Sequence, residues 1–115
     1  MRLPHADRLD VPEAKIVDYL LSPTHPQGRH KAAFFRAFGF SPEEWEQLAE
    51  ALRRHGADND VAAEEDTPFG RRYSVDGELA GLDGRRPRLR TVWFVERGQE
   101  VPRLVTAHPI AGKAP

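Results

Sequence analysis

The spacing of hydrophobic residues changes halfway along the chain, and this change limits the folds that the chain can adopt. Up to about residue 56, apolar residues recur at intervals of three and four, which is typical of amphipathic helices; from about residue 69 they alternate with polar residues, which is typical of half-buried strands. A length of 115 residues suits one domain. We therefore predict a single α+β domain over residues 1–115, with a helical part over about 10–56 and a sheet part over about 69–109.

Three helices are expected in the first part. The first begins at Asp10-Val11-Pro12-Glu13, a sequence that favours a helix start, and ends at Ser22 because Pro23 follows. The second runs over about 29–38, with Gly39 as its left-handed cap.

The third helix has the clearest local signal. Ser41-Pro42-Glu43-Glu44 is a capping box with proline at the first helical position. Apolar residues then repeat at helical spacing, namely Trp45, Leu48, Ala49 and Leu52. This pattern predicts a helix over about 42–55 that Gly56 ends.

Three strands are expected in the second part, over about 72–79, 89–95 and 103–108. Their short connections favour an antiparallel meander of three strands, or of four if a short edge strand forms near Val61. The apolar faces of the helices need a partner, so the N-terminal helices should pack on one face of this C-terminal sheet. Residues from Ala111 onward are expected to form a frayed tail.

Composition excludes several classes of function. There are no cysteines, so disulfides, thiolate metal sites and cysteine nucleophiles are ruled out. The net charge is −1, which argues against a broad, nonspecific grip on nucleic acid but leaves room for a local basic pocket. No histidine pair has the i, i+4 spacing of a helical metal site, and we predict no metal and no cofactor. No apolar run is long enough to span a membrane, so we expect a cytoplasmic protein without membrane contact.

Two stretches resemble a bacterial domain family of unknown function whose members are short and free-standing. They are residues 19–35, YLLSPTHPQGRHKAAFF, and residues 88–109, RLRTVWFVERGQEVPRLVTAHP. They carry an HPxG..KA..F motif and an RTVW...PRLVTA motif, and the resemblance covers about residues 3–109. The family often has a second glycine after the position of Gly28, where this chain has Arg29, so the path of this loop is expected to differ.

That family is similar in layout to the barnase–EndoU–colicin–RelE-like RNases, a group rich in toxins that cut RNA on the open face of a small sheet. The resemblance implies a metal-independent endoribonuclease of bacterial toxin type, which would cleave RNA by attack of the 2′-hydroxyl. It also implies RNA as substrate and a small acidic antitoxin or immunity protein as partner. The alternative is a non-catalytic protein-interaction domain of a toxin–antitoxin-like or other two-gene bacterial module.

The candidate catalytic residues are His25, Lys31 and Thr106. Metal-free RNA cleavage needs proton-transfer groups and cations beside the phosphate, and histidine, lysine and threonine can supply these parts. Lys31 lies in the first turn of a predicted helix, where its charge opposes the helix dipole unless an anion binds. Equally, His25 could simply fix its loop and Lys31 could be a solvated charge.

The candidate substrate-binding residues lie on the predicted strands: Tyr73, Arg90, Thr91 and Arg103. An arginine in a strand can hold a phosphate, but Arg90 could equally pair across strands with Asp76 or Glu78. His108 is a further titratable group at the end of the last strand; His5, His30 and His55 are interpreted as incidental. The RNase hypothesis requires that His25, Lys31, Arg90 and Thr106 converge in one cleft.

Overall fold

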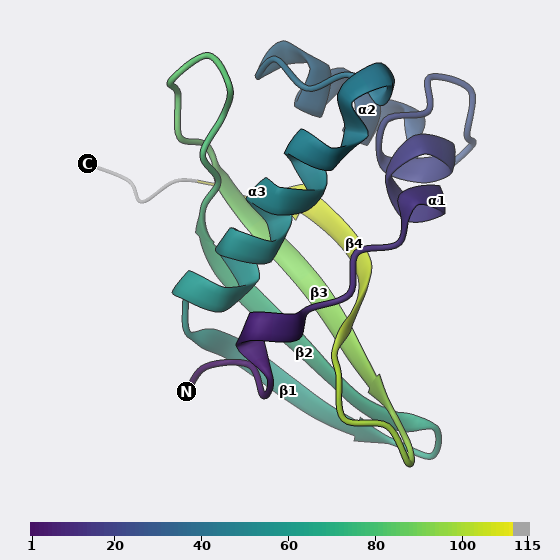
Figure 1. Ribbon diagram of the computed structural model, residues 1–115, viewed down its shortest axis with the longest axis vertical. Helices are drawn as coiled ribbons and strands as arrows, with labels where there is room; N and C mark the ends of the chain where they lie inside the picture. The colour runs from purple at the N-terminus through teal and green to yellow at the C-terminus, as the bar shows by residue number, and fades with distance from the viewer. Residues whose placement is uncertain (112–115) are drawn as a thin grey trace.

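Four antiparallel strands form one sheet in the order β1-β2-β3-β4, and the helices lie across one of its faces (Figure 1). A computed structural model describes residues 1–111. The strands are β1 (Val61–Thr67), β2 (Gly70–Glu78), β3 (Arg88–Glu96) and β4 (Arg103–Pro109). The predicted α+β class and meander are confirmed, and the strand suspected near Val61 is a seven-residue edge strand. Of the tail expected from Ala111 onward, all but Ala111 lies outside the described residues.

The first predicted helix is shorter and less regular than expected. It consists of α1 (Glu13–Lys15) and a π-helical turn, η2 (Ile16–Leu20), closed by a 2.7 Å hydrogen bond from the Leu21 N–H to the Ile16 carbonyl. A short 3₁₀ turn, η1 (Ala6–Arg8), precedes it. The second helix, α2 (Arg29–Ala37), ends as predicted at Gly39, whose φ is +99°.

The third helix runs past its predicted end. A 3₁₀ turn, η3 (Pro42–Glu44), leads into α3 (Trp45–Asp58), and Ser41 makes no side-chain cap to it. Gly56 lies inside the helix, and the Trp93 indole occupies the space beside it. A Cβ at this position would lie 2.7 Å from the indole carbon Cζ2. Glycine here serves close packing and not helix termination.

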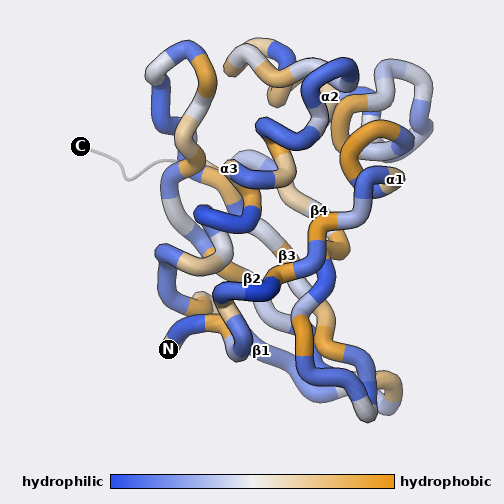
Figure 2. Tube along the Cα trace, in the orientation of Figure 1, coloured by the Kyte–Doolittle hydropathy of each residue, from blue (hydrophilic) through white to orange (hydrophobic). Residues whose placement is uncertain are grey.

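The core lies between α3 and the helix-facing side of the sheet. On β3, Leu89, Thr91 and Trp93 are fully buried, whereas the alternate residues Arg90 and Phe94 are half-buried on the other side. This alternation follows from the two-residue period of a strand. We call the side of the sheet away from the helices the open face. Near the tip of the β1–β2 hairpin the tube is largely blue, so most of the residues there are hydrophilic (Figure 2).

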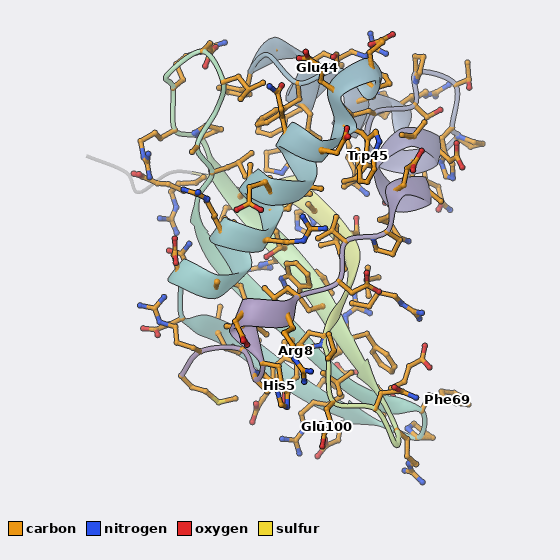
Figure 3. All side chains as sticks on the ribbon, in the orientation of Figure 1. His5, Arg8, Glu44, Trp45, Phe69 and Glu100 are labelled. Carbon is orange, nitrogen blue, oxygen red and sulfur yellow. The ribbon has the colours of Figure 1, made fainter. Side chains whose placement is uncertain are left out.

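The N-terminal segment closes part of the β4 edge. The Asp10 N–H donates to the Pro102 carbonyl, and the Leu104 N–H donates to the Asp10 carbonyl, both at 2.9 Å. In Figure 3, His5 and Arg8 lie near Glu100 of the β3–β4 turn. At the same end of the sheet the Arg97 N–H donates to the Phe69 carbonyl at 2.9 Å, and the Phe69 side chain, at the tip of the β1–β2 hairpin, is 78% exposed and projects from the molecule (Figure 3).

Candidate active site

Three polar side chains from distant parts of the chain meet beside β4. The Lys31 ammonium donates to the Tyr19 hydroxyl at 2.5 Å and to Thr106 Oγ1 at 3.3 Å, and the two hydroxyl oxygens lie 2.9 Å apart. We call these three residues the Tyr19 cluster. Within residues 1–111, Lys31 makes no salt bridge to a carboxylate. The cluster therefore offers an ammonium and two hydroxyls to an anion.

Each member of the Tyr19 cluster is positioned by a different element. Tyr19 belongs to the π-helical turn η2, Lys31 to the first turn of α2, and Thr106 to β4. Thr106 pairs with Val92 across the sheet, and a register shift falls just beyond that pair. Such a bulge redirects the strand and its side chains. Both the π turn and the bulge are local irregularities, and such features often occur at functional sites.

His25 packs beside the cluster and its tautomer is fixed. Its Nδ1 atom accepts hydrogen bonds from the backbone N–H groups of Gln27 and Gly28, both at 3.0 Å. An atom that accepts two amide protons carries no proton itself, so the neutral ring holds its proton on Nε2. The imidazole lies edge-on to the Tyr19 ring, with 4.9 Å between centroids. His25 thus braces the loop and also presents an N–H donor next to Tyr19.

The cations around Tyr19 favour its ionised form. Burial opposes ionisation, but the hydrogen bonds to Lys31 and Thr106 and the charges of Lys31 and Lys15 outweigh it, so the pKa of the Tyr19 phenol lies below its ordinary value. The two ammonium groups stand 4.9 Å (Lys31) and 5.3 Å (Lys15) from the centroid of its ring. Tyr19 therefore loses its proton more readily than a solvated tyrosine, so more of it is present as phenolate at a given pH.

A depression adjoins the cluster. A pocket of about 390 Å³ is lined by Lys15, Tyr19, His25 and Thr106, together with Gln27 and Val105. Tyr19 and His25 also line a neighbouring pocket of about 630 Å³ that extends to Arg103. His25 and Thr106 line the smaller pocket, and Lys31 joins them through its hydrogen bond to Thr106. Arg103 lines the larger pocket, and Arg90, which the hypothesis also required, lines neither.

Arg90 is engaged with a carboxylate on the open face. Its guanidinium donates to both carboxylate oxygens of Asp76, at 2.7 and 2.9 Å, and this pairing lowers the pKa of Asp76. The cross-strand pairing considered for Arg90 is therefore the arrangement found. His108 pairs with Arg90 across the strands; its burial and the charges of Arg90 and Lys31 lower its pKa.

None of the four candidate substrate-binding residues belongs to the Tyr19 cluster, and two of them lie in the core. Thr91 is fully buried and Tyr73 is 6% exposed, and both point toward the helices. Because Thr91 is one residue from Arg90 along β3, the two necessarily face opposite sides of the sheet. Their placement assigns Thr91 and Tyr73 to the core.

His55 was interpreted from the sequence as incidental, but it is buried and hydrogen-bonded through both ring nitrogens. The Trp93 indole N–H donates to Thr91 Oγ1 at 2.8 Å, and this hydroxyl lies 3.0 Å from His55 Nδ1. His55 Nε2 lies 2.8 Å from the Leu89 carbonyl. Together these contacts place the proton on Nε2 and let Thr91 donate to Nδ1. The signal was present in the sequence, because position 55 continues the helical spacing from Leu52.

Tyr19 was also missed as a polar participant. Its spacing from Ile16 placed it on the apolar face of the first helix, and its ring does pack against the core. The π turn, however, leaves its hydroxyl at the site. The available signal was positional: Tyr19 begins the same motif stretch that contains His25 and Lys31.

Two further features of residues 1–111 can be stated. No group of three or more histidine, aspartate or glutamate side chains in this range is arranged to hold a metal ion. No helix in this range is both long and apolar enough to cross a membrane.

Comparison with known proteins supports the fold and identifies the family. The fold is similar to that of a chain in a contact-dependent growth inhibition toxin–immunity protein complex from Klebsiella pneumoniae 342, with a TM-score of 0.69 and 16% identity over 87% of this chain and 98% of that chain. None of the curated proteins matches the sequence. The family model DUF6883, a domain of unknown function, matches residues 2–111. Because this match spans nearly the whole chain, the protein belongs to the DUF6883 family.

Proposed function

We propose that the protein is a metal-independent endoribonuclease of bacterial toxin type. The observation that carries this proposal is the meeting of Lys31, Tyr19 and Thr106 at hydrogen-bond distance, with no carboxylate paired to the ammonium among the described residues. Such a site suits a phosphate, since an ammonium and two hydroxyls can all donate to its oxygens.

The reaction we propose needs only proton transfers and charge stabilisation. The 2′-oxygen attacks the adjacent phosphorus and loses its proton to a base. The bond from phosphorus to the 5′-oxygen breaks, and that oxygen takes up a proton. The products are a 2′,3′-cyclic phosphate and a 5′-hydroxyl, and no water is consumed.

The roles follow from the geometry. Tyr19 is the proposed base, because two ammonium groups flank its ring and its pKa is lowered. Lys31 and Thr106 would hold the non-bridging phosphate oxygens. His25 is proposed as a hydrogen-bond donor through Nε2, since proton uptake at Nδ1 would displace two backbone amides.

The acid is assigned to His108. This residue lies two positions beyond Thr106 on the same strand, so both side chains are on the open face. Its pKa is lowered by burial and by the charges of Arg90 and Lys31, and an imidazolium in such surroundings releases its proton readily.

A toxin role and an immunity partner are part of the same proposal. The similar fold belongs to a complex described as a toxin with its immunity protein. An acidic partner that covered Lys15, Lys31 and Arg103 would block the Tyr19 cluster electrostatically and sterically.

The proposal is tested by incubating purified protein with total RNA in EDTA and end-labelling the products. We expect fragments with 5′-hydroxyl ends. Their formation should fall at least about 100-fold in Lys31→Met, which loses a cation that stabilises the transition state, and in Tyr19→Phe, which loses the proton acceptor. Arg29→Met is the matched control, since it removes an exposed cation from the same helical turn and should retain activity. Absence of cleavage, or cleavage that Lys31→Met leaves intact, contradicts the proposal.

A second candidate is the non-catalytic interaction domain, which one observation favours. The β1 edge of the sheet is exposed over residues 62–66, and Phe69 stands exposed at the end of the same hairpin. An exposed strand edge can pair with a strand of another protein. This role predicts that Phe69→Ala abolishes partner binding, and that expression of the wild-type chain does not arrest growth.

A further inference from the structure

Phe94 is a large aromatic residue that lies outside the core. It alternates along β3 with Trp93 and Val95, and both of these contact the core cluster. Phe94 is half-buried on the open face. A half-exposed aromatic ring can stack on a planar group of a ligand.

The ring of Phe94 is supported by a glycine. A Cβ placed on Gly70 of β2 would lie 2.9 Å from ring atoms Cε2 and Cζ, so the ring lies directly over the glycine backbone. Only glycine leaves room for this contact. One side of the ring is therefore held in place, which fixes its orientation without covering it fully.

A pocket opens beside the ring. It has a volume of about 330 Å³ and is lined by Phe94, Glu96, Gln99, Val101, Arg103 and Asp10. Within it the Arg103 guanidinium donates to a Glu96 carboxylate oxygen at 2.5 Å. The pocket thus combines one aromatic surface with an acceptor, an amide and a guanidinium.

This pocket and the depression beside the Tyr19 cluster share one lining residue. Arg103 lines both this pocket and the larger depression that contains Tyr19 and His25. From Arg103 to Thr106 the path along β4 is three residues, or about 10 Å at the rise of a strand. A ligand that reaches both ends must therefore be elongated, as two or more linked nucleotides are.

We propose that the Phe94 pocket binds an unpaired base of single-stranded RNA whose backbone passes the Tyr19 cluster. This inference rests on the proposed function and names its substrate class. Every base has a face that can stack on an aromatic ring, and Glu96, Gln99 and Arg103 can hydrogen-bond to the base edge. Base-paired RNA does not fit, because its bases are stacked on each other and not free to enter the pocket.

The charges on this face agree with a base and not with a second phosphate. Glu96 balances Arg103, and Asp10 adds a carboxylate to the lining. A pocket with two carboxylates and one guanidinium repels a phosphate. Two cations that make no salt bridge among residues 1–111, Lys15 and Lys31, lie instead around the Tyr19 ring.

Binding is measured by fluorescence anisotropy with a short single-stranded oligodeoxynucleotide, which lacks the attacking 2′-hydroxyl and stays intact. Phe94→Ala should weaken binding about 10-fold or more, as expected for loss of one stacked base, whereas Phe94→Tyr should bind like the wild type. Phe69→Ala is the matched control, because it removes an exposed phenylalanine from the neighbouring hairpin tip and should bind normally. Thermal melting checks that each variant is folded.

A second probe separates this inference from the proposed function. An oligonucleotide that lacks the one base expected to stack on Phe94 should bind to the wild type and to Phe94→Ala with equal affinity. No oligonucleotide binding, or equal binding of the intact probe by wild type and Phe94→Ala, overturns the base pocket even if RNA is cleaved. Binding that depends on Phe94 without any RNA cleavage supports the pocket and overturns only the nuclease.

Discussion

The hydroxyl of Tyr19 lies 2.9 Å from that of Thr106, although the two residues are 87 positions apart in the chain. Lys31 lies within hydrogen-bond distance of both. This contact links the first helical segment to the last strand. The ionisation of Tyr19 therefore reports directly on the assembled site.

The phenol of Tyr19 should titrate below the ordinary range of tyrosine, and Lys31 should be the main reason. Removing the ammonium in Lys31→Met deletes both a hydrogen bond to the phenolate and a positive charge, so the pKa of Tyr19 should rise. The chain has only two tyrosines, so ultraviolet absorbance of phenolate resolves the change. Tyr19→Phe identifies the signal. An unchanged titration curve in Lys31→Met would show that the two side chains do not interact in solution.

Loss of the Thr91 hydroxyl should destabilise the fold. Thr91→Val keeps the shape of the side chain but leaves His55 Nδ1 and the Trp93 indole N–H without their common partner. Unsatisfied buried polar groups of this kind cost about 1–3 kcal/mol each. Urea denaturation should show this loss in the free energy of unfolding. Thr91→Ser, which keeps the hydroxyl, should lose less, and equal losses in both variants would argue against the network.

Stability should fall when the pH drops below about 6.5. Burial lowers the pKa of His55 below its ordinary value of 6.5, so the unfolded chain binds a proton more readily than the folded one. The contribution is complete above the unfolded pKa and is lost as the pH falls toward the folded pKa. Melting temperatures at pH 7.5 and 5.5 measure it. His108→Gln should reduce the drop only slightly, because His108 is more exposed; a melting temperature independent of pH would contradict a neutral, buried His55.

Gly56→Ala should destabilise the protein, although alanine is the better helix former. In an open helix this change would stabilise by about 1 kcal/mol. Here the added methyl meets the Trp93 indole, and overpacking of this kind costs about 1–3 kcal/mol. Chemical denaturation compares the variant with Ala51→Gly, at a half-buried position of the same helix that should show the ordinary propensity effect. A more stable Gly56→Ala would mean that the indole can move aside.

Much of the fold was predictable because hydrophobic spacing determines which faces are buried. The three sheet strands 72–79, 89–95 and 103–108 were placed close to their observed ends. Capping residues and glycine identified α3 and the end of α2. The helix end that depends on tertiary contacts was predicted wrongly. Gly56 was taken as a helix end because its packing against Trp93 is invisible along the chain.

The candidate site was only partly predictable for a related reason. Lys31 was identified from its unfavourable position at a helix N-terminus, and His25 and Thr106 from the motifs that contain them. Tyr19 was missed because a π turn cannot be anticipated from helical spacing. Thr91 was misplaced because it was grouped with Arg90, although adjacent residues of a strand face opposite sides of the sheet.

The order of the segments along the chain has a consequence for synthesis. Thr106 belongs to β4, so the Tyr19 cluster cannot form until the chain from Tyr19 to Thr106 has left the ribosome. If the cluster cuts RNA, the translating ribosome is not exposed to a working nuclease before β4 has emerged. A messenger truncated before the codon for Arg103 would yield a product without the third member of the cluster.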